Sequence, residues 1–163
     1  MSAQADEGLE MAELVRALAG PVEGERRGAL RELALRLLRS QSRVVSARAW
    51  AMAPRLVEAG VLGLDDLRAL KGELLSQLRW PPASQGACVD LWAAVAWLVG
   101  AGVLAPEEVR RYSASLWRLL DSATGADRER LLRIAEELRA RGALSPRPRT
   151  SGWRVLSEDS VIL

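Results

Sequence analysis

The chain has 163 residues, 23 basic and 21 acidic side chains, and a hydrophobic content of 49%. It contains no His, which excludes Ser-His-Asp and Cys-His nucleophiles, imidazole proton transfer and histidine metal sites. The single cysteine, Cys88, excludes an intrachain disulfide. A chain of this length fits one domain with a substantial core.

The basic residues are unevenly chosen. Lys71 is the one lysine, and every other basic residue is arginine. Asn and Phe are absent and Ile occurs twice. Lys, Asn, Phe and Ile have AT-rich codons, so the skew is typical of a GC-rich genome, and we expect a bacterial source. The arginine excess is therefore weak support for a phosphate-binding role, although the guanidinium fork suits phosphate.

Two features bear on location. Residues 1–8 are acidic and lack the basic and apolar regions of a signal peptide. The most apolar run, residues 91–105, is 15 residues long, whereas a membrane-spanning helix needs about 20. We therefore expect a buried helix there, no membrane segment and a cytoplasmic protein.

In chain order, apolar spacing first predicts helices over residues 8–19 and 25–39. Their apolar residues are Leu9, Leu14, Val15 and Leu18, and Leu30, Leu33, Ala34, Leu37 and Leu38. Pro81-Pro82 divides the middle of the chain. No segment shows the sustained alternation that is typical of a strand.

A repeat of about forty residues organises the chain from residue 43 onward. Segments 49–62, 91–104 and 131–144 align without gaps, and each ends in Gly-(Val/Ala)-Leu. The repeated glycines, spaced 42 and then 40 residues apart, are Gly60, Gly102 and Gly142. The position ten residues earlier holds Trp50, Trp92 and Leu132. Each glycine stands where a helix commonly ends on a left-handed residue.

The first two copies continue into a second predicted helix. An acidic pair opens it, Asp65-Asp66 in one copy and Glu107-Glu108 in the other, where the helix dipole favours negative charge. Apolar residues then follow at i, i+4, i+5 and i+8, the spacing of a buried helical stripe. They are Leu70, Leu74, Leu75 and Leu78, and Tyr112, Leu116, Trp117 and Leu120.

This pattern resembles HEAT-like and related α-helical repeats, which have two helices per unit of about forty residues. The resemblance covers residues 43–144, with units at 43–82 and 83–122 and a partial unit at 123–144. It implies stacked antiparallel helical hairpins that bind partners along their helices. An irregular helical bundle with internal duplication is the alternative. We expect an all-α fold of about seven helices, one domain over residues 1–144 and an extended tail over residues 145–163.

The acidic and cysteine side chains do not form the pattern of a catalytic site. Adjacent carboxylates point around a helix instead of converging on one substrate, so we assign both acidic pairs to helix starts. Cys88 begins the most apolar predicted helix and fits a small buried side chain. We therefore expect no catalytic residue, no metal site, no cofactor, no small-molecule substrate and no enzymatic activity.

The tryptophans divide into two groups. Four of them lie in apolar helical stripes and are expected in the core: Trp50, Trp92, Trp97 and Trp117. The other two, Trp80 and Trp153, lie outside these stripes and are candidate interface anchors, since Trp is enriched at binding hot spots.

Charge is distributed in blocks. Residues 1–25 carry six acidic side chains and one basic, residues 26–55 carry eight arginines and one acid, and residues 139–154 carry five arginines and no acid. On a continuous helix, Arg36, Arg39 and Arg43 would form one stripe, and with Arg48 they are the candidate phosphate contacts. The alternative is a solvated face that pairs with the acidic N-terminal helix.

The tail changes character at Pro146 and Pro148, which favour an extended path. Apolar clusters at residues 153–156 and 161–163 follow, and a purely solvating tail would not need them. The tail residues that we assign to partner binding are Arg147, Arg149, Trp153, Val155, Leu156 and Ile162. A disordered end with incidental apolar residues is the alternative.

Two functional hypotheses follow. The first is a non-enzymatic scaffold or adaptor that binds a protein partner, in a hetero-complex or a homo-oligomer, through helix faces and the tail. The second is a small basic helical subunit that contacts a nucleic-acid backbone within a larger complex. The near-neutral total charge favours the first.

Overall fold

The computed structural model describes residues 3–147, and their side chains from Asp6 onward. This part of the chain is all-α, with no strand. Its helices are α1 (Ala3–Leu18), α2 (Gly24–Leu38), α3 (Arg43–Ala51), α4 (Ala53–Glu58), α5 (Leu64–Arg79), α6 (Gln85–Gly100), α7 (Pro106–Arg110), α8 (Ser113–Ser122) and α9 (Gly125–Ala140). The predicted fold class is therefore confirmed at the level of helical content.

The described chain has nine helices where about seven were expected, because two predicted helices are interrupted. Between α3 and α4, Pro54 follows Met52 closely, lacks an N–H and cannot continue the ladder of the preceding helix. Between α7 and α8, the Ser113 hydroxyl donates to the Arg110 carbonyl (2.6 Å) and Tyr112 N–H bonds Val109 O. These local bonds compete with the regular helical pattern.

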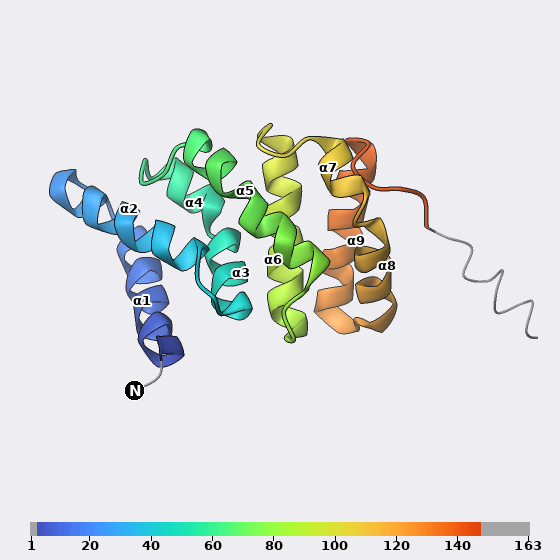
Figure 1. The fold of residues 1–163 in the computed structure, drawn as a ribbon, viewed down its shortest axis with the longest axis horizontal. Helices are drawn as coiled ribbons and strands as arrows, with labels where there is room; N and C mark the ends of the chain where they lie inside the picture. Colours follow the sequence, from blue (N-terminus) through green and yellow to red (C-terminus); the bar gives the residue numbers. More distant parts are fainter. Residues whose placement is uncertain (1–2, 148–163) are drawn as a thin grey trace, which may run out of the picture.

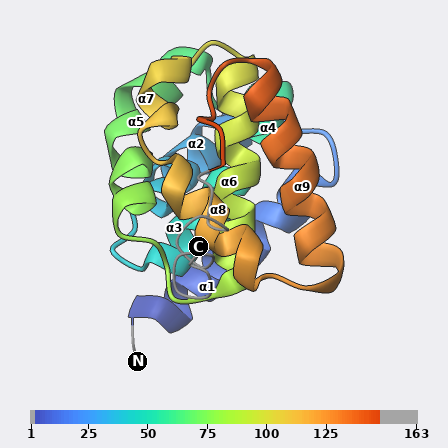
Figure 2. The same ribbon diagram turned by 90° about the vertical axis from the view of Figure 1, so that its right-hand side faces the viewer.

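The helices follow one another along the long axis of the molecule, with α1 and α2 at one end and α8 and α9 at the other (Figure 1). The view along this axis shows α5 and α7 on one side and α9 on the opposite side (Figure 2). Helix α6 lies in the middle and packs against both α3 and α9, while α8 packs against α6 and α9. Every unit therefore shares its core with the next.

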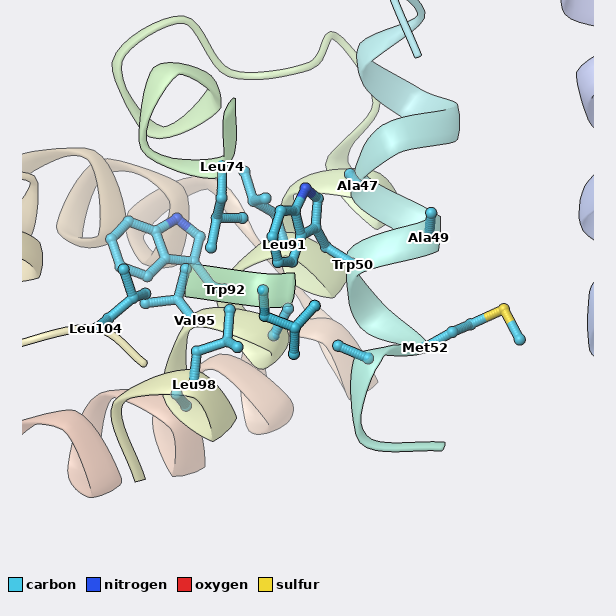
Figure 3. Packing of buried hydrophobic residues seen from close by; sticks show 14 of the residues in the cluster. Ala47, Ala49, Trp50, Met52, Leu74, Leu91, Trp92, Val95, Leu98 and Leu104 are labelled. Carbon is cyan, nitrogen blue, oxygen red and sulfur yellow. The ribbon is translucent and has the colours of Figure 1, made fainter. Parts of the chain in front are cut away.

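The core is centred on α6, the helix of the most apolar run. Ten of its residues are buried: Ala87, Cys88, Val89, Leu91, Trp92, Ala94, Val95, Ala96, Leu98 and Val99. From α3, Trp50 projects toward Leu74 of α5 and Leu91 of α6 and is completely buried (Figure 3). The prediction that Trp50 and Trp92 fill the core is confirmed, and Trp97 and Trp117 are half-buried.

The three repeated glycines end their helices in the same way. Gly60, Gly102 and Gly142 have φ values of +75°, +82° and +75°, in the left-handed region. In each copy the glycine N–H bonds a carbonyl three residues earlier, and the next N–H bonds a carbonyl five residues earlier. This is the Schellman pattern, which satisfies two carbonyls at a helix end. The predicted left-handed caps are confirmed at all three positions.

The apolar stripe predicted for the first helix is buried only in part. Leu14 is fully buried in α1, whereas Leu9 is 68% exposed and Val15 is half exposed. Helix α1 lies at one end of the row and packs mainly against α2 and α3 (Figure 1). A terminal helix has neighbours on one side, so part of its apolar surface stays in solvent.

Candidate functional site

No group of three or more His, Cys, Asp or Glu side chains lies together in residues 6–147 in a way that could hold a metal ion. Cys88 is buried at the start of α6 and its thiol donates to the Pro82 carbonyl (3.2 Å). Burial raises the pKa of the Cys88 thiol, so the thiol form is favoured over the nucleophilic thiolate. The described residues therefore bring together no nucleophile and activating base.

A small apolar cavity of about 230 Å³ lies beside Cys88 between α5, α6 and α8. One polar wall residue, Gln77, is held by a chain of hydrogen bonds: its Nε2 donates to Ser46 Oγ (2.6 Å), and Ser46 Oγ donates to Leu38 O (2.7 Å). Because the hydroxyl proton is used on Leu38, Ser46 can only accept from Gln77, which fixes the orientation of the amide. This network joins α2, α3 and α5.

The two acidic pairs act as helix starts, as predicted. Asp66 Oδ2 accepts from the Gly63 N–H (2.8 Å) and Glu108 Oε1 accepts from the Ala105 N–H (2.9 Å). Each carboxylate also binds a cation from an earlier part of the chain: Arg31 of α2 lies 2.5 Å from Asp66, and Lys71 of the first unit lies 3.0 Å from Glu108.

These contacts stabilise the charged form of both carboxylates. The Arg31 hydrogen bond, followed by that of the Gly63 N–H, lowers the pKa of Asp66. The Ala105 N–H, more than Lys71, lowers the pKa of Glu108. Carboxylates with a lowered pKa and a cation partner are typical of structural helix caps, whereas a general acid near neutral pH requires a raised pKa.

The four candidate phosphate contacts do not form one stripe. Helix α2 ends at Leu38, and Ser42 caps α3 by accepting the Val45 N–H (3.3 Å). Arg36 is therefore on α2, Arg39 is the residue after it, and Arg43 and Arg48 belong to α3. The condition for a continuous stripe, one unbroken helix, is not met.

Two of these arginines are engaged within the chain. Arg36 pairs with Glu10 of the acidic α1 (2.5 Å), which is the pairing that the alternative interpretation of this segment predicts. Arg43 Nη1 donates to the Trp80 carbonyl (2.8 Å). Arg39 and Arg48 are exposed.

Trp80 forms an exposed aromatic surface at the end of α5. It is 56% exposed, and the Arg79 guanidinium lies 5.6 Å from its ring centroid. Helix α5 ends at Arg79 because Pro81-Pro82 follows, and the Trp80 carbonyl is held by Arg43. We call Arg43, Arg79 and Trp80 the Trp80 surface. The exposure of Trp80 outside the helical stripes was indicated by the sequence.

Of the predicted tail residues, the structure describes Arg147. Its guanidinium pairs with Asp121 and lies 5.7 Å from the Trp117 ring centroid, both on α8. Arg149, Trp153, Val155, Leu156 and Ile162 lie outside the described residues.

The beginning of the tail is fixed along α8. The Ser145 N–H donates to Ser113 Oγ (2.9 Å), and Trp117 Nε1 donates to the Ser145 carbonyl (3.1 Å). Ser113, Trp117 and Asp121 are spaced by four residues and so lie on one face of the helix. Residues 145–147 therefore run along that face toward the C-terminal end of α8.

An apolar groove of about 260 Å³ opens beside these contacts, between α8 and α9. Its walls are Trp117, Leu120, Leu132, Ala135, Glu136, Arg139 and Arg147. We call it the α8–α9 groove. Sequence reasoning missed this groove, although the repeat alignment contained a signal, because it showed no second helix after the third glycine.

Comparison of the chain with protein-family models, curated proteins and solved structures returned no match. Among the helices in residues 3–147, none has the length and apolar character needed to cross a membrane.

Proposed function

We propose that this protein is a non-enzymatic helical scaffold or adaptor that binds a protein partner through helix faces and its C-terminal tail, as a cytoplasmic subunit of a larger complex. The observation that carries the proposal is the Trp80 surface. A large aromatic ring is more than half exposed and carries a stacked guanidinium, just beyond the last residue of α5.

The chemistry of this surface suits a protein partner. Trp and Arg are among the residues most enriched at interface hot spots. Trp buries a large area with two rotatable bonds, and the planar Arg guanidinium both stacks and donates several hydrogen bonds. The backbone beneath the ring is held by Arg43, which limits the entropy lost on binding. A partner with an apolar pocket and an acidic rim would match the ring and the Arg79 guanidinium.

We include a HEAT-like stacking of the units in this proposal. It is supported by the recurrence of the glycine cap and by the contact of Lys71 in the first unit with the capping carboxylate of Glu108 in the second. In such an array the side chains at successive turns and helix ends form one extended surface, which is the usual binding surface of helical repeats.

Two contacts favour a protein partner over a nucleic-acid backbone. Arg36 is neutralised by Glu10, and Arg43 is directed at a carbonyl of its own chain. Strong phosphate binding requires several free cations along one line. Of the four candidate phosphate contacts, this leaves Arg39 and Arg48, which are exposed and belong to different segments.

The test is affinity purification of the full chain from its native cells, with Trp80→Ala compared against Leu9→Ala. Both side chains are exposed large hydrophobics, Leu9 on α1 and Trp80 just after the end of α5. We expect one or more co-purifying proteins to be retained by Leu9→Ala and lost, or weakened at least tenfold, by Trp80→Ala. Equal retention by both variants would remove the Trp80 surface from the proposal.

A second measurement addresses nucleic acid. Fluorescence anisotropy with single-stranded and duplex oligonucleotides at low salt is expected to show no binding at micromolar protein. Binding that falls steeply with salt and is weakened by Arg39→Ala and Arg48→Ala would instead support the alternative.

A further inference from the structure

One repeat position changes its environment along the chain. The residue ten positions before the repeated glycine is Trp50, Trp92 or Leu132, and these side chains are 0%, 3% and 43% exposed. Trp50 is covered by Leu74 of α5 and Leu91 of α6 (Figure 3), and Trp92 shares the cavity wall with Leu119 of α8. In the first two units, a following helix therefore supplies a cover. In the third unit, no helix within the described residues follows α9.

The uncovered position lies in the α8–α9 groove. Leu132 forms its wall together with Leu120, Ala135 and the ring of Trp117. A large apolar side chain that entered the groove would remove Leu132 from water. Each Å² of apolar surface buried in this way contributes about 25 cal/mol of favourable free energy.

The chain itself enters this groove. Ser145 is held on α8 by Ser113 and Trp117, and Arg147 pairs with Asp121 and forms part of the groove wall. The next large apolar residue in the sequence is Trp153, six residues after Arg147. Six extended residues span up to about 20 Å, about the length of a helix of thirteen residues, so Trp153 reaches any part of the groove.

We propose that residues 148–163 dock in cis across the α8–α9 groove, with Trp153 as the apolar anchor that covers Leu132. The segment takes the place that a second helix occupies in the first two units. This inference goes beyond the proposed function, because it gives the tail a place on its own chain from which a partner would have to displace it, and it leaves the Trp80 surface aside.

A tethered segment has an advantage over any free ligand of the same groove. A short link holds the segment at an effective concentration of the order of millimolar, without the translational entropy cost of a bimolecular encounter. The ion pair and the hydrogen bonds of residues 145–147 shorten the free link further. The α8–α9 groove is therefore filled by its own chain before a second copy or a partner competes for it.

Trypsin provides a direct test on the full chain, because Arg149 and Arg154 are cleavage sites within the segment. The variant Leu132→Asp places a charge in the groove, and Leu9→Asp is the matched control at another exposed leucine. Docking predicts cleavage after Arg154 at least fivefold faster in Leu132→Asp than in the native chain, and unchanged in Leu9→Asp. Equal rates in all three proteins would overturn the proposal.

A cross-linking experiment distinguishes the occupants. In a Cys88→Ser background, Glu136→Cys in the groove wall with Gly152→Cys keeps both Leu132 and Trp153, and it is expected to form a disulfide within one chain under mild oxidation, seen as a monomer on a non-reducing gel. Leu9→Cys with Gly152→Cys is the control and is expected to stay reduced. A cross-linked dimer would assign the groove to a second copy, and equal cross-linking in both pairs would show no preferred docking. Both outcomes overturn docking in cis.

These readouts use the isolated protein and need no partner. If the tail does not dock in cis, the effect of Trp80→Ala on co-purification is still expected. If Trp80→Ala does not change co-purification, the expected protease and cross-linking results still hold.

Discussion

The first two unit junctions and the third begin alike and then differ. All three end a helix on a left-handed glycine with the same pair of backbone hydrogen bonds. Three residues after each glycine, a backbone N–H needs an acceptor. In the first two copies the acceptor is a carboxylate six residues after the glycine, Asp66 or Glu108. In the third copy Pro148 stands at the position of that carboxylate, and the Ser145 N–H donates to the Ser113 hydroxyl of the preceding unit.

The difference shows what decides the path of the chain after a helix cap. The cap requires only a glycine and a buried apolar residue after it, so it is the same in all copies. The next helix requires its own N-terminal acceptor, which Pro148 cannot supply, whereas Pro146 stands at the repeat position of Pro106, which begins α7. The preceding unit then provides the hydrogen bonds.

The largest expected effect tests the shared part of the junctions. Leu98→Ala and Leu138→Ala each remove a fully buried side chain below the glycine. Each is expected to lower the free energy of unfolding by about 2–5 kcal/mol, because a cavity remains. Urea denaturation measures both. If Leu138→Ala lowered the free energy of unfolding far less than Leu98→Ala, the core at the end of α9 would be less tightly packed than the core at the end of α6.

The second prediction concerns the glycines themselves. Gly102→Ala and Gly142→Ala meet no close atom that would clash, yet both force an alanine into the left-handed region. We expect each to destabilise by about 1–2 kcal/mol, the cost of that backbone conformation. Gly72→Ala, inside α5 with open space around it, is the control of opposite sign and should stabilise by up to about 1 kcal/mol. Thermal melts compare the three variants.

The third prediction uses pH to distinguish the carboxylate acceptor, Asp66, from the hydroxyl acceptor, Ser113. The pKa of Asp66 is lowered in the folded state, so its stabilisation is present above about pH 4 and is lost as the pH falls through the folded value. Asp66→Ala should cost about 1 kcal/mol at pH 7 and less at pH 2.5, where the carboxyl is protonated in the unfolded chain. Ser113→Ala should cost about 1 kcal/mol at both pH values, because a hydroxyl does not titrate there. Urea titrations at both pH values measure the difference, and parallel pH dependence would contradict it.

The smallest effect is expected at the ion pair between units. Lys71→Met removes the cation that faces Glu108, and the side chain of Lys71 is partly exposed. The loss should be below about 1 kcal/mol and should shrink in 1 M salt, since partly exposed pairs are screened. Glu108 keeps its larger contact with the Ala105 N–H, so Glu108→Ala should cost more than Lys71→Met.

Much of the fold could be predicted because its signals are local. The glycine that ends a helix, the acidic pair that begins the next one and the apolar stripe that follows each act within about three helical turns. The two helix breaks were not predicted, although Pro54 was visible, because the repeat alignment made the helices look continuous.

The candidate sites were predictable to different degrees. Trp80 was recognised because Pro81-Pro82 removes it from its helical stripe. Leu132 was not recognised, since its repeat position is the one that buries Trp50 and Trp92. Its exposure depends on whether another element packs over α9, which is a tertiary property. The Arg36 pair with Glu10 likewise depends on how α1 packs on α2, and charge blocks alone left two interpretations open.

The central position of α6 has a consequence for cooperativity. Long repeat arrays lose their terminal units one after another, because each unit contacts only its neighbours. Here one helix supplies a buried face to both α3 and α9, so neither half of the molecule retains a closed core when α6 unfolds. The described chain is therefore short enough to behave as a single thermodynamic unit despite its repetitive construction, and α6 is the element that links the two halves.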